Sequence, residues 1–417
     1  MCYAIPGKII EIKKNVAVLD YFGEKRNVLL DQDVKVGDYA YAQGGVLINV
    51  IEKAEAERVL IFWKEKFFEL KEIDEKTSKV QEINASTKVL EILEKVNLSK
   101  ELTKEDMMFL LKVEDSRELK LIYETANNVR QKEHDNACCV HGIIEFSNYC
   151  KNDCSYCGIR KSRNIQRYRM SVKEIVEVAK KAVSLGFKAL VLQSGEDYWY
   201  DEEKLIEIVK KIRKLNVLIF LSIGVREKRI YEKLYQAGAR GVLLRFETSD
   251  RELFERERPK TNFNKRISLI RDLKEMKYII ATGFLVGIGE SEENIVNNIL
   301  LTKELEPDMY SFGPFIPSGG SSKVEKDLIF KIIALSRFID KKSKILVTSA
   351  LETLDSNARK EGLMAGANSL MLNVTPKKYK ELYNLYPGRK DEEVIKAVDE
   401  TVDLLYSIGR APTDLGI

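Results

Sequence analysis

The pattern of hydrophobic and polar positions changes twice along the chain. Up to about residue 55, short segments alternate apolar and polar residues, and turn sequences separate them at Phe22-Gly23-Glu24 and Val36-Gly37-Asp38. A period of two is typical of strands that bury one face. We expect strands near 8–12, 16–21, 26–30 and 46–50, which together predict a small antiparallel, OB-like β-barrel.

From about residue 55 to 132 the apolar residues recur every three or four positions, as in 89–96 and 107–111. That spacing predicts amphipathic helices. Ser86-Thr87 and Thr103 stand where N-terminal caps are needed. This stretch is therefore predicted to be a helical connector.

Beyond residue 140, apolar strand-like segments alternate with amphipathic helices. Strands are expected near 142–147, 188–194, 217–222, 240–247, 279–286, 308–313, 345–349 and 368–372. Eight parallel strands joined by helices close most economically into a (βα)8 TIM-type barrel, although an open doubly wound sheet is an alternative. A barrel would gather its functional groups at the carboxyl ends of these strands.

These patterns predict an α/β protein of three parts. The small β-barrel domain is expected at 1–75, the helical connector at 76–135 and the large barrel at 136–417. A length of 417 residues suits one barrel of roughly 250 residues with smaller attachments.

The amino-acid composition limits the classes of partner that the protein is expected to bind. Lys and Arg number 69 against 65 Asp and Glu, so the net charge of +4 reflects a balanced charged surface rather than a nucleic-acid-binding field. No basic segment precedes an apolar leader, and no stretch reaches about 18 uninterrupted apolar residues. We therefore expect a cytoplasmic protein with neither nucleic acid nor membrane as a partner.

Three cysteines form the clearest chemical motif. Cys150, Cys154 and Cys157 follow the first predicted strand of the large barrel, with three and two residues between them. A compact loop of this kind can direct three thiolates at a 4Fe-4S cluster, leaving one iron open to a small chelating molecule. The alternative is a structural zinc site with a fourth ligand from Cys138, Cys139, His134 or His141.

The segment Cys150-Lys-Asn-Asp-Cys154-Ser-Tyr-Cys157 resembles the radical-SAM signature, with Tyr156 as its aromatic residue. The resemblance implies two cofactors, a 4Fe-4S cluster and S-adenosyl-L-methionine. It also implies a metal and catalytic role for the three cysteines, which together produce a 5′-deoxyadenosyl radical.

Two later segments support this resemblance. Gln193-Ser194-Gly195-Glu196 resembles the family's GE element, which receives the methionyl amino group. Gly283 to Glu290 resembles the family's adenine motif, with Leu285 in place of isoleucine, and its spacing differs from the dinucleotide-binding GxGxxG.

From about residue 100 to 390 the chain resembles the HydE family of FeFe-hydrogenase maturases, through segments such as Arg245-Phe246-Glu247-Thr248 and Gly313-Pro314-Phe315-Ile316-Pro317. This resemblance implies an iron carbonyl-cyanide substrate, a reductant such as ferredoxin or flavodoxin, and no auxiliary cluster, because no cysteine follows Cys157. The implied cofactor-binding residues are Tyr156, Ser194, Gly195, Glu196, Ser222, Arg245, Glu247, Arg266 and Gly287. The implied substrate residues are Thr348, Asn373 and Thr375.

The N-terminal segment Met1-Cys2-Tyr3-Ala4-Ile5-Pro6-Gly7-Lys8 resembles the HypC family of hydrogenase-maturation chaperones. The resemblance implies that Cys2 binds an iron carbonyl-cyanide group and that other maturation proteins are partners. Gln43 occupies a position where the family commonly has histidine, which puts iron binding in doubt.

Two alternatives stay open. One is a small-molecule radical enzyme similar to methylornithine synthase or biotin synthase, and the other is a scaffold that carries an iron fragment without catalysis. Cys138 and Cys139 are either a surface pair near the barrel floor or iron ligands, with the structural role preferred, and His134 and His141 are expected to pack or cap.

Overall fold

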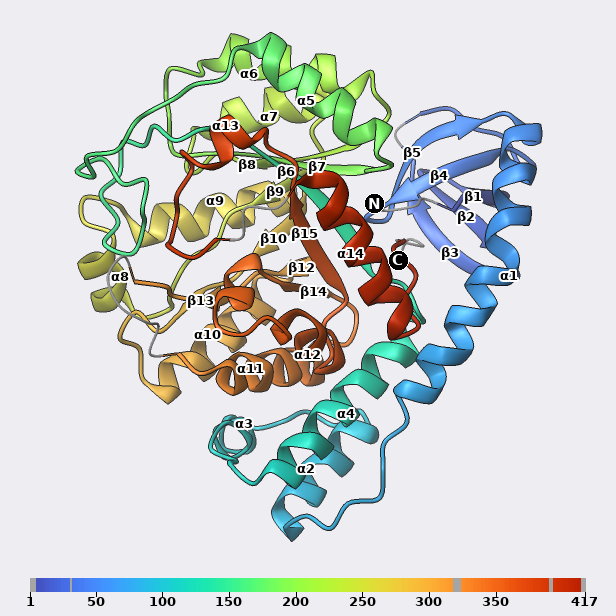
Figure 1. The fold of residues 1–417 in the computed structure, drawn as a ribbon, viewed down its shortest axis with the longest axis vertical. Helices are drawn as coiled ribbons and strands as arrows, with labels where there is room; N and C mark the ends of the chain where they lie inside the picture. The colour runs from blue at the N-terminus through green and yellow to red at the C-terminus, as the bar shows by residue number, and fades with distance from the viewer. Residues whose placement is uncertain (1–4, 31, 318–323, 390–392, 414–417) are drawn as a thin grey trace.

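The computed structural model describes residues 5–30, 32–317, 324–389 and 393–413. Cys2 lies outside the described residues. Two closed barrels, one small and one large, make up most of the fold, and helices connect them (Figure 1).

The small barrel has the strand order β1-β2-β3-β5-β4. Its strands are β1 (Gly7–Lys13), β2 (Val16–Tyr21), β3 (Glu24–Leu29), β4 (Tyr39–Gln43) and β5 (Val46–Ile51). The pattern of the sequence does not reveal β4, because four of its five residues are buried and the usual alternation is missing.

Four helices form the connector and bring the chain to the large barrel. They are α1 (Lys53–Thr77), α2 (Thr87–Asn97), α3 (Lys104–Leu111) and α4 (Ser116–His134). Thr103 and Asp106 cap α3 reciprocally, since the Thr103 side chain accepts from the Asp106 N–H and Asp106 accepts from the Thr103 N–H. No helix among the described residues combines the length and the apolar character needed to cross a bilayer.

The large barrel confirms the predicted TIM-type fold, with the closed strand order β10-β12-β14-β15-β6-β7-β8-β9. Its strands are β6 (Cys139–Ser147), β7 (Ala189–Ser194), β8 (Leu218–Ser222), β9 (Gly241–Leu243), β10 (Ile279–Thr282), β12 (Met309–Tyr310), β14 (Lys344–Val347) and β15 (Ser369–Asn373). Strand β6 pairs with both β15 and β7 in parallel, which completes the closure.

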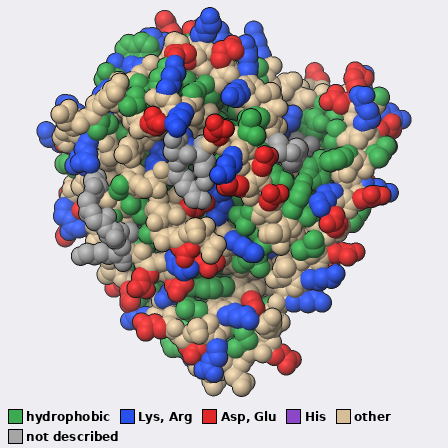
Figure 2. Space-filling view, viewed as in Figure 1, with side chains coloured by type: hydrophobic (Ala, Val, Ile, Leu, Met, Phe, Trp, Pro, Cys, Tyr) green, Lys and Arg blue, Asp and Glu red, His purple; other side chains and the backbone are tan. Residues whose placement is uncertain are grey.

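Helices cover the outside of this barrel. They are α5 (Val172–Ser184), α6 (Glu202–Arg213), α7 (Lys228–Ala237), α8 (Arg251–Glu257), α9 (Phe263–Glu275), α10 (Glu292–Glu304), α11 (Lys326–Ile339), α12 (Ala358–Met364), α13 (Lys377–Lys380), α14 (Val394–Ser407) and the 3-10 helix η1 (Ser349–Thr353). On the face drawn in Figure 2, acidic and basic side chains are interspersed, as the balanced composition suggests.

Two of the predicted barrel strands are shorter than their apolar segments. After β10 the backbone turns at Gly283, with φ of +156°, and a separate two-stranded sheet forms from β11 (Leu285–Val286) and β13 (Gly313–Pro314). A side chain at Gly283 would collide with the backbone of Ser311, since its Cβ would lie 2.3 Å from that carbonyl oxygen. The extra sheet thus extends the barrel at its carboxyl end.

The small domain covers the opposite end of the large barrel, here called the barrel floor, where the strands begin. Gly44, in the turn between β4 and β5, lies against Leu218 and Ile279, the first residues of β8 and β10. Val46 belongs to the same apolar cluster as inward-facing side chains such as Phe220. The described part of the small domain is therefore remote from the strand ends where a TIM-type barrel carries its chemistry.

One buried carboxylate ties together the connector and the C-terminal segment. Asp74, on α1, accepts hydrogen bonds from Arg130 on α4 at 2.7 and 2.8 Å and from Arg410 at 2.8 Å. All three side chains are at most 1% exposed. Asn127 accepts from both arginines, which supplies further partners for the two buried cations.

Replacement of Asp74 by alanine should destabilise the protein by about 3–5 kcal/mol, because it leaves two buried arginines without their carboxylate. Urea denaturation followed by circular dichroism would measure the change in the free energy of unfolding. The matched control is Glu72→Ala on the same helix. Its exposed pair with Lys76 should contribute less than about 1 kcal/mol, and equal losses in both variants would contradict the argument.

Candidate active site

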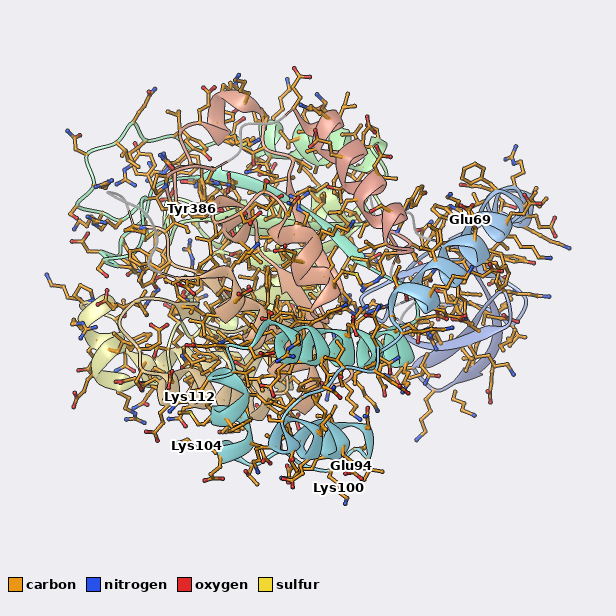
Figure 3. All side chains as sticks on the ribbon, turned by 60° about the horizontal axis from the view of Figure 1, so that its bottom comes forward. Glu69, Glu94, Lys100, Lys104, Lys112 and Tyr386 are labelled. Carbon is orange, nitrogen blue, oxygen red and sulfur yellow. The ribbon has the colours of Figure 1, made fainter. Side chains whose placement is uncertain are left out.

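A cavity of about 290 Å³ lies at the carboxyl ends of the large barrel's strands. Residues from nearly every strand end line it, together with the loop that follows β6. Its volume is close to the lower end of the roughly 300–1,000 Å³ typical of small-molecule sites. Tyr386, one of its lining residues, is labelled over the barrel in Figure 3, well apart from Glu69 on α1.

The loop after β6 brings the three cysteines of the motif to this cavity. Cys150, Cys154 and Cys157 all line it. The loop is anchored on both sides: the Lys151 N–H donates to the Glu196 carbonyl at 3.1 Å, and the Gly158 N–H donates to the Leu385 carbonyl at 2.8 Å. Its shape is therefore fixed by the barrel rather than by the loop alone.

Burial keeps two of these thiols protonated when no metal is bound. It raises the pKa of Cys157 to about 12 and also raises the pKa of Cys154. Iron must then displace these protons, since the thiolate is the form that binds metal. The buried thiols suit a bound cluster better than a reactive free nucleophile.

A buried group of charged side chains stands beside the thiols. Glu247 lies 3.3 Å from Arg245, 3.8 Å from Arg258 and 3.8 Å from Arg266. Glu196, at the end of β7, is 3.9 Å from both Arg258 and Arg266 and 3.5 Å from Lys151. At the cavity itself two carboxylates thus face three arginines, which leaves an excess of positive charge, whereas Lys151 is exposed and does not line the cavity.

This excess favours an anionic ligand. Burial, together with the neighbouring Arg258, lowers the pKa of Arg266, so its charge is incompletely compensated. Arg258 donates a hydrogen bond of 2.6 Å to the Tyr156 hydroxyl. A carboxylate entering between these guanidinium groups would gain charge-assisted hydrogen bonds.

Glu247 is held in an unusual conformation. Its φ is +75°, which non-glycine residues rarely adopt, and such outliers gather at functional sites. The predicted strand near 240–247 is shorter in the structure, because β9 ends at Leu243, so Arg245 and Glu247 lie beyond it. The bend nevertheless keeps the two side chains paired.

Several polar atoms of the cavity wall have no hydrogen bond within the described residues. Glu247 Oε2, Arg258 Nε and Thr348 Oγ1 are buried and lack a hydrogen bond. Such atoms are costly unless a ligand or water satisfies them. Hydroxyl, amino and carboxylate groups of S-adenosylmethionine have the chemistry to do so, and three thiols stand beside them for a cluster, so the residues fit both groups.

A second polar group lines the cavity and involves residues that the sequence did not single out. The buried Glu145 pairs with Arg389 at 2.7 Å and accepts a hydrogen bond of 2.8 Å from Asn373. Its backbone N–H donates to Thr375 Oγ1 at 2.8 Å. Burial raises the pKa of Glu145, although Arg389 opposes the shift.

Most of the predicted site residues line this one cavity: Cys150, Cys154, Tyr156, Cys157, Ser194, Gly195, Glu196, Ser222, Arg245, Glu247, Arg266 and Thr348. Asn373 and Thr375 are not among the lining residues, and each forms a hydrogen bond with Glu145. Gly287 is not among the lining residues, and the side chain of Val324 packs against it, whereas Leu285 of the same motif does line the cavity.

The sequence analysis missed three charged residues that line the cavity, two of them for a physical reason. Arg258 and Arg389 come from charged segments that read as exposed surface, and only the fold buries them. Glu145 could have been found, since it precedes the cysteine motif on an otherwise apolar strand whose interior a lone carboxylate would not occupy without a partner.

Comparisons with known proteins find relatives of both barrels. The family model "Radical SAM superfamily" matches residues 144–301, and the model "HupF/HypC family" matches residues 1–63. The FeFe hydrogenase maturase subunit HydE of Thermotoga maritima is 38% identical over 334 residues, which cover 77% of this chain and 95% of that protein.

Other relatives carry a different name. The 3-methylornithine synthase of Methanosarcina acetivorans is 32% identical over 327 residues, covering 76% of this chain and 93% of that protein. A crystal structure of methylornithine synthase has a TM-score of 0.67 at 27% identity and covers 77% of this chain and 97% of its own. The maturase HydG from Carboxydothermus hydrogenoformans, at 20% identity and a TM-score of 0.67, shares the fold.

Gly195→Ala should displace the cysteine loop, because the added Cβ would lie 2.2 Å from the Tyr149 carbonyl oxygen and 2.8 Å from the Cys150 Cβ. We expect iron affinity to fall about 10- to 100-fold, as for other losses of ligand support. Iron analysis and the visible absorbance after anaerobic reconstitution would measure it. Ser194→Ala, which adds no volume, is the control, and normal iron content in Gly195→Ala would contradict the prediction.

Proposed function

The chain belongs to the radical SAM superfamily, within the group that contains HydE and 3-methylornithine synthase, and from this premise we propose that it modifies a metal-bound fragment during hydrogenase maturation. The enzyme class follows from the family, whereas the substrate is the proposal. The observation that carries it is the fusion, in one chain, of a radical SAM barrel related to HydE and a HypC-family domain.

In this proposal the residues of the cavity have different roles. Cys150, Cys154 and Cys157 hold a 4Fe-4S cluster, which together with S-adenosylmethionine supplies a 5′-deoxyadenosyl radical. Glu196 accepts hydrogen bonds from the methionyl amino group, and Arg266 pairs with the methionyl carboxylate. Glu247 Oε2, which has no hydrogen bond within the described residues, accepts from the ribose hydroxyls.

The remaining predicted cofactor-binding residues shape the cavity or position other residues of the site. Tyr156 holds Arg258 toward the two carboxylates. Ser194 and Ser222 line the wall beside the cofactor, and Arg245 balances the charge of Glu247. Gly195 lets the cysteine loop approach, and Gly287 fixes the turn of the adenine motif, whose neighbour Leu285 lines the cavity.

The substrate would lie deeper in the barrel, against Thr348 and the Glu145–Arg389 pair. Asn373 and Thr375 act as positioning residues there, because each hydrogen-bonds to Glu145 rather than lining the cavity. A ferredoxin or flavodoxin would supply the electron.

Anaerobic reconstitution followed by reduction with S-adenosylmethionine should yield 5′-deoxyadenosine and methionine, as chromatography would detect. Cys154→Ala should reduce product to background, because the cluster loses one of its three protein ligands. Cys138→Ala, which removes a buried thiol that does not line the cavity, should keep the activity. A cluster that forms without product would instead favour the non-catalytic scaffold.

A second candidate function rests on the methylornithine synthase relatives, which make a small-molecule mutase the alternative. The HypC-family match at 1–63 favours the iron substrate, because a mutase acting on a free amino acid has no evident need of such a domain. Anaerobic assays for turnover of an iron carbonyl-cyanide substrate and for formation of 3-methylornithine would separate the two.

If the small domain presents the iron fragment at Cys2, Cys2→Ser should leave the cleavage of S-adenosylmethionine intact and abolish turnover of the iron-bound substrate. The assay above, combined with infrared spectroscopy of carbonyl and cyanide ligands, would measure both. Loss of both activities would argue against separate roles for the two domains.

A further inference from the structure

The outer side of the cysteine loop is open to solvent, opposite the candidate active site. Residues that line the cavity alternate along the loop with exposed residues, as they do in an extended chain. Those that line the cavity are Cys150, Asn152, Cys154 and Tyr156, and the exposed residues between them are Lys151, Asp153 and Ser155. A single layer of chain therefore separates the three thiols from the solvent.

The loop and the segment that follows it are strongly basic. Between residues 150 and 169 the only acid in the sequence is Asp153, whereas the basic residues are Lys151, Arg160, Lys161, Arg163, Arg167 and Arg169. The whole chain, with 69 basic and 65 acidic residues, is nearly balanced. Positive charge is thus concentrated next to the cysteine motif.

Carboxylates compensate only part of this charge. Asp153 lies 3.9 Å from Arg160, and Arg169 pairs with Asp197 at 2.7 Å. The Arg167 guanidinium, by contrast, donates to main-chain carbonyl oxygens at 2.5 to 3.0 Å, which carry no full charge. The segment therefore keeps a net positive charge in the folded protein.

Two large aromatic side chains lie beside the loop. Tyr198 and Trp199, which follow β7, are 54% and 45% exposed. The Lys151 ammonium lies 4.1 Å from the centre of the Tyr198 ring. The Lys204 ammonium lies 4.9 Å from the centre of the Trp199 ring. Exposed aromatic rings next to cations are typical of surfaces that bind another protein.

These side chains form one surface, here called the loop face, which consists of Lys151, Lys161, Arg163, Tyr198 and Trp199. The Lys161 N–H donates to the Asn152 carbonyl at 2.8 Å, which holds the basic segment against the cysteine loop. The contact between Lys151 and Tyr198 joins the loop to the aromatic pair. The loop face therefore covers the outside of the same wall that the three cysteines line on the inside.

We propose that the loop face binds a small acidic protein that carries a one-electron redox group, and that the electron enters through the cysteine loop. This inference rests on the proposed function, because it concerns the electron that the cluster requires. The carrier loses one electron and the cluster gains it, and no bond forms or breaks in this step. Ferredoxins and flavodoxins are acidic, so opposite charges steer their docking to this face.

The position of the loop face favours an electron carrier over a partner that needs only positive charge, such as RNA. An electron carrier must bring its redox group close to the cluster, and at the loop face only one layer of chain lies between them. RNA would use the same cations without any need to approach the cluster. The basic segment is also local, since the chain as a whole is balanced in charge.

Binding of a carrier to the full-length protein tests the loop face without any need for turnover. The probes are a flavodoxin and a two-cluster ferredoxin, each titrated by isothermal calorimetry in low salt. Lys161→Glu combined with Arg163→Glu should weaken binding at least about tenfold and reduce its dependence on salt. Trp199→Ala, which removes an aromatic contact, should weaken it about tenfold.

The matched control reverses two exposed charges elsewhere on the large barrel. Lys210→Glu combined with Lys214→Glu, at the C-terminal end of α6, should leave carrier binding unchanged. The control changes the net charge by the same amount as the variant of the loop face. Any difference between the two variants therefore reports the position of the charges.

Kinetics separate the route of the electron from the chemistry. With dithionite as reductant, all these variants should form 5′-deoxyadenosine at the wild-type rate, because dithionite does not need a docking surface. With the reduced carrier, Lys161→Glu combined with Arg163→Glu should raise the KM for the carrier about tenfold and change kcat little.

Failure of both carriers to bind the wild-type protein in low salt would overturn the proposal. So would wild-type binding in the loop-face variant, equal weakening in the control, or tighter binding of an RNA oligonucleotide than of either carrier. Calorimetry requires no turnover, so a failure of the proposed radical chemistry would appear as missing product with dithionite and leave the binding result unaffected.

Discussion

The position of the small domain depends on one buried carboxylate. Asp74 joins α1, which leads out of the small barrel, to Arg130 of the connector and to Arg410 behind the large barrel. Ions buried this deeply persist only with full sets of partners, so the three segments hold one relative arrangement. The Gln43–Val46 turn is thereby kept at the barrel floor, where Gly44 and Val46 complete the apolar packing.

At the other end of the barrel, the residues of the active site are arranged at a cost to stability. Glu196 and Glu247 are buried among three arginines, Glu247 has a strained backbone, and several polar atoms lack partners within the described residues. Each feature costs folding free energy that the apolar layers of the barrel must offset. A ligand that binds the folded state satisfies these groups and stabilises the protein by mass action.

The sequence predicted the periodic features well. Both barrels and the connector follow from apolar spacing, and the cysteine loop was identified by its spacing after β6. The features that the sequence could not predict depend on which residues the folded structure buries. Strand β4 lacks alternation because both of its faces are covered, and Arg258 and Arg389 become site residues only when loops distant in sequence fold over the strand ends. Gly287 is the opposite case. The sequence motif that contains it was recognised, but Leu285 of that motif lines the cavity and Gly287 does not.

The two ends of the barrel constrain how the domains can cooperate. Within one chain the described part of the small domain contacts the floor, and layers containing Ile143, Leu346 and Met371 lie between the floor and the active site. A fragment held between the described part of the small domain and the floor therefore cannot reach the active-site cavity by simple apposition of the two domains. Strand β6 spans the distance between the two ends, with Cys139 and His141 at the floor and Glu145 at the cavity. Transfer of any bound fragment from the floor to the cavity thus requires either release and rebinding or movement of the interior layer.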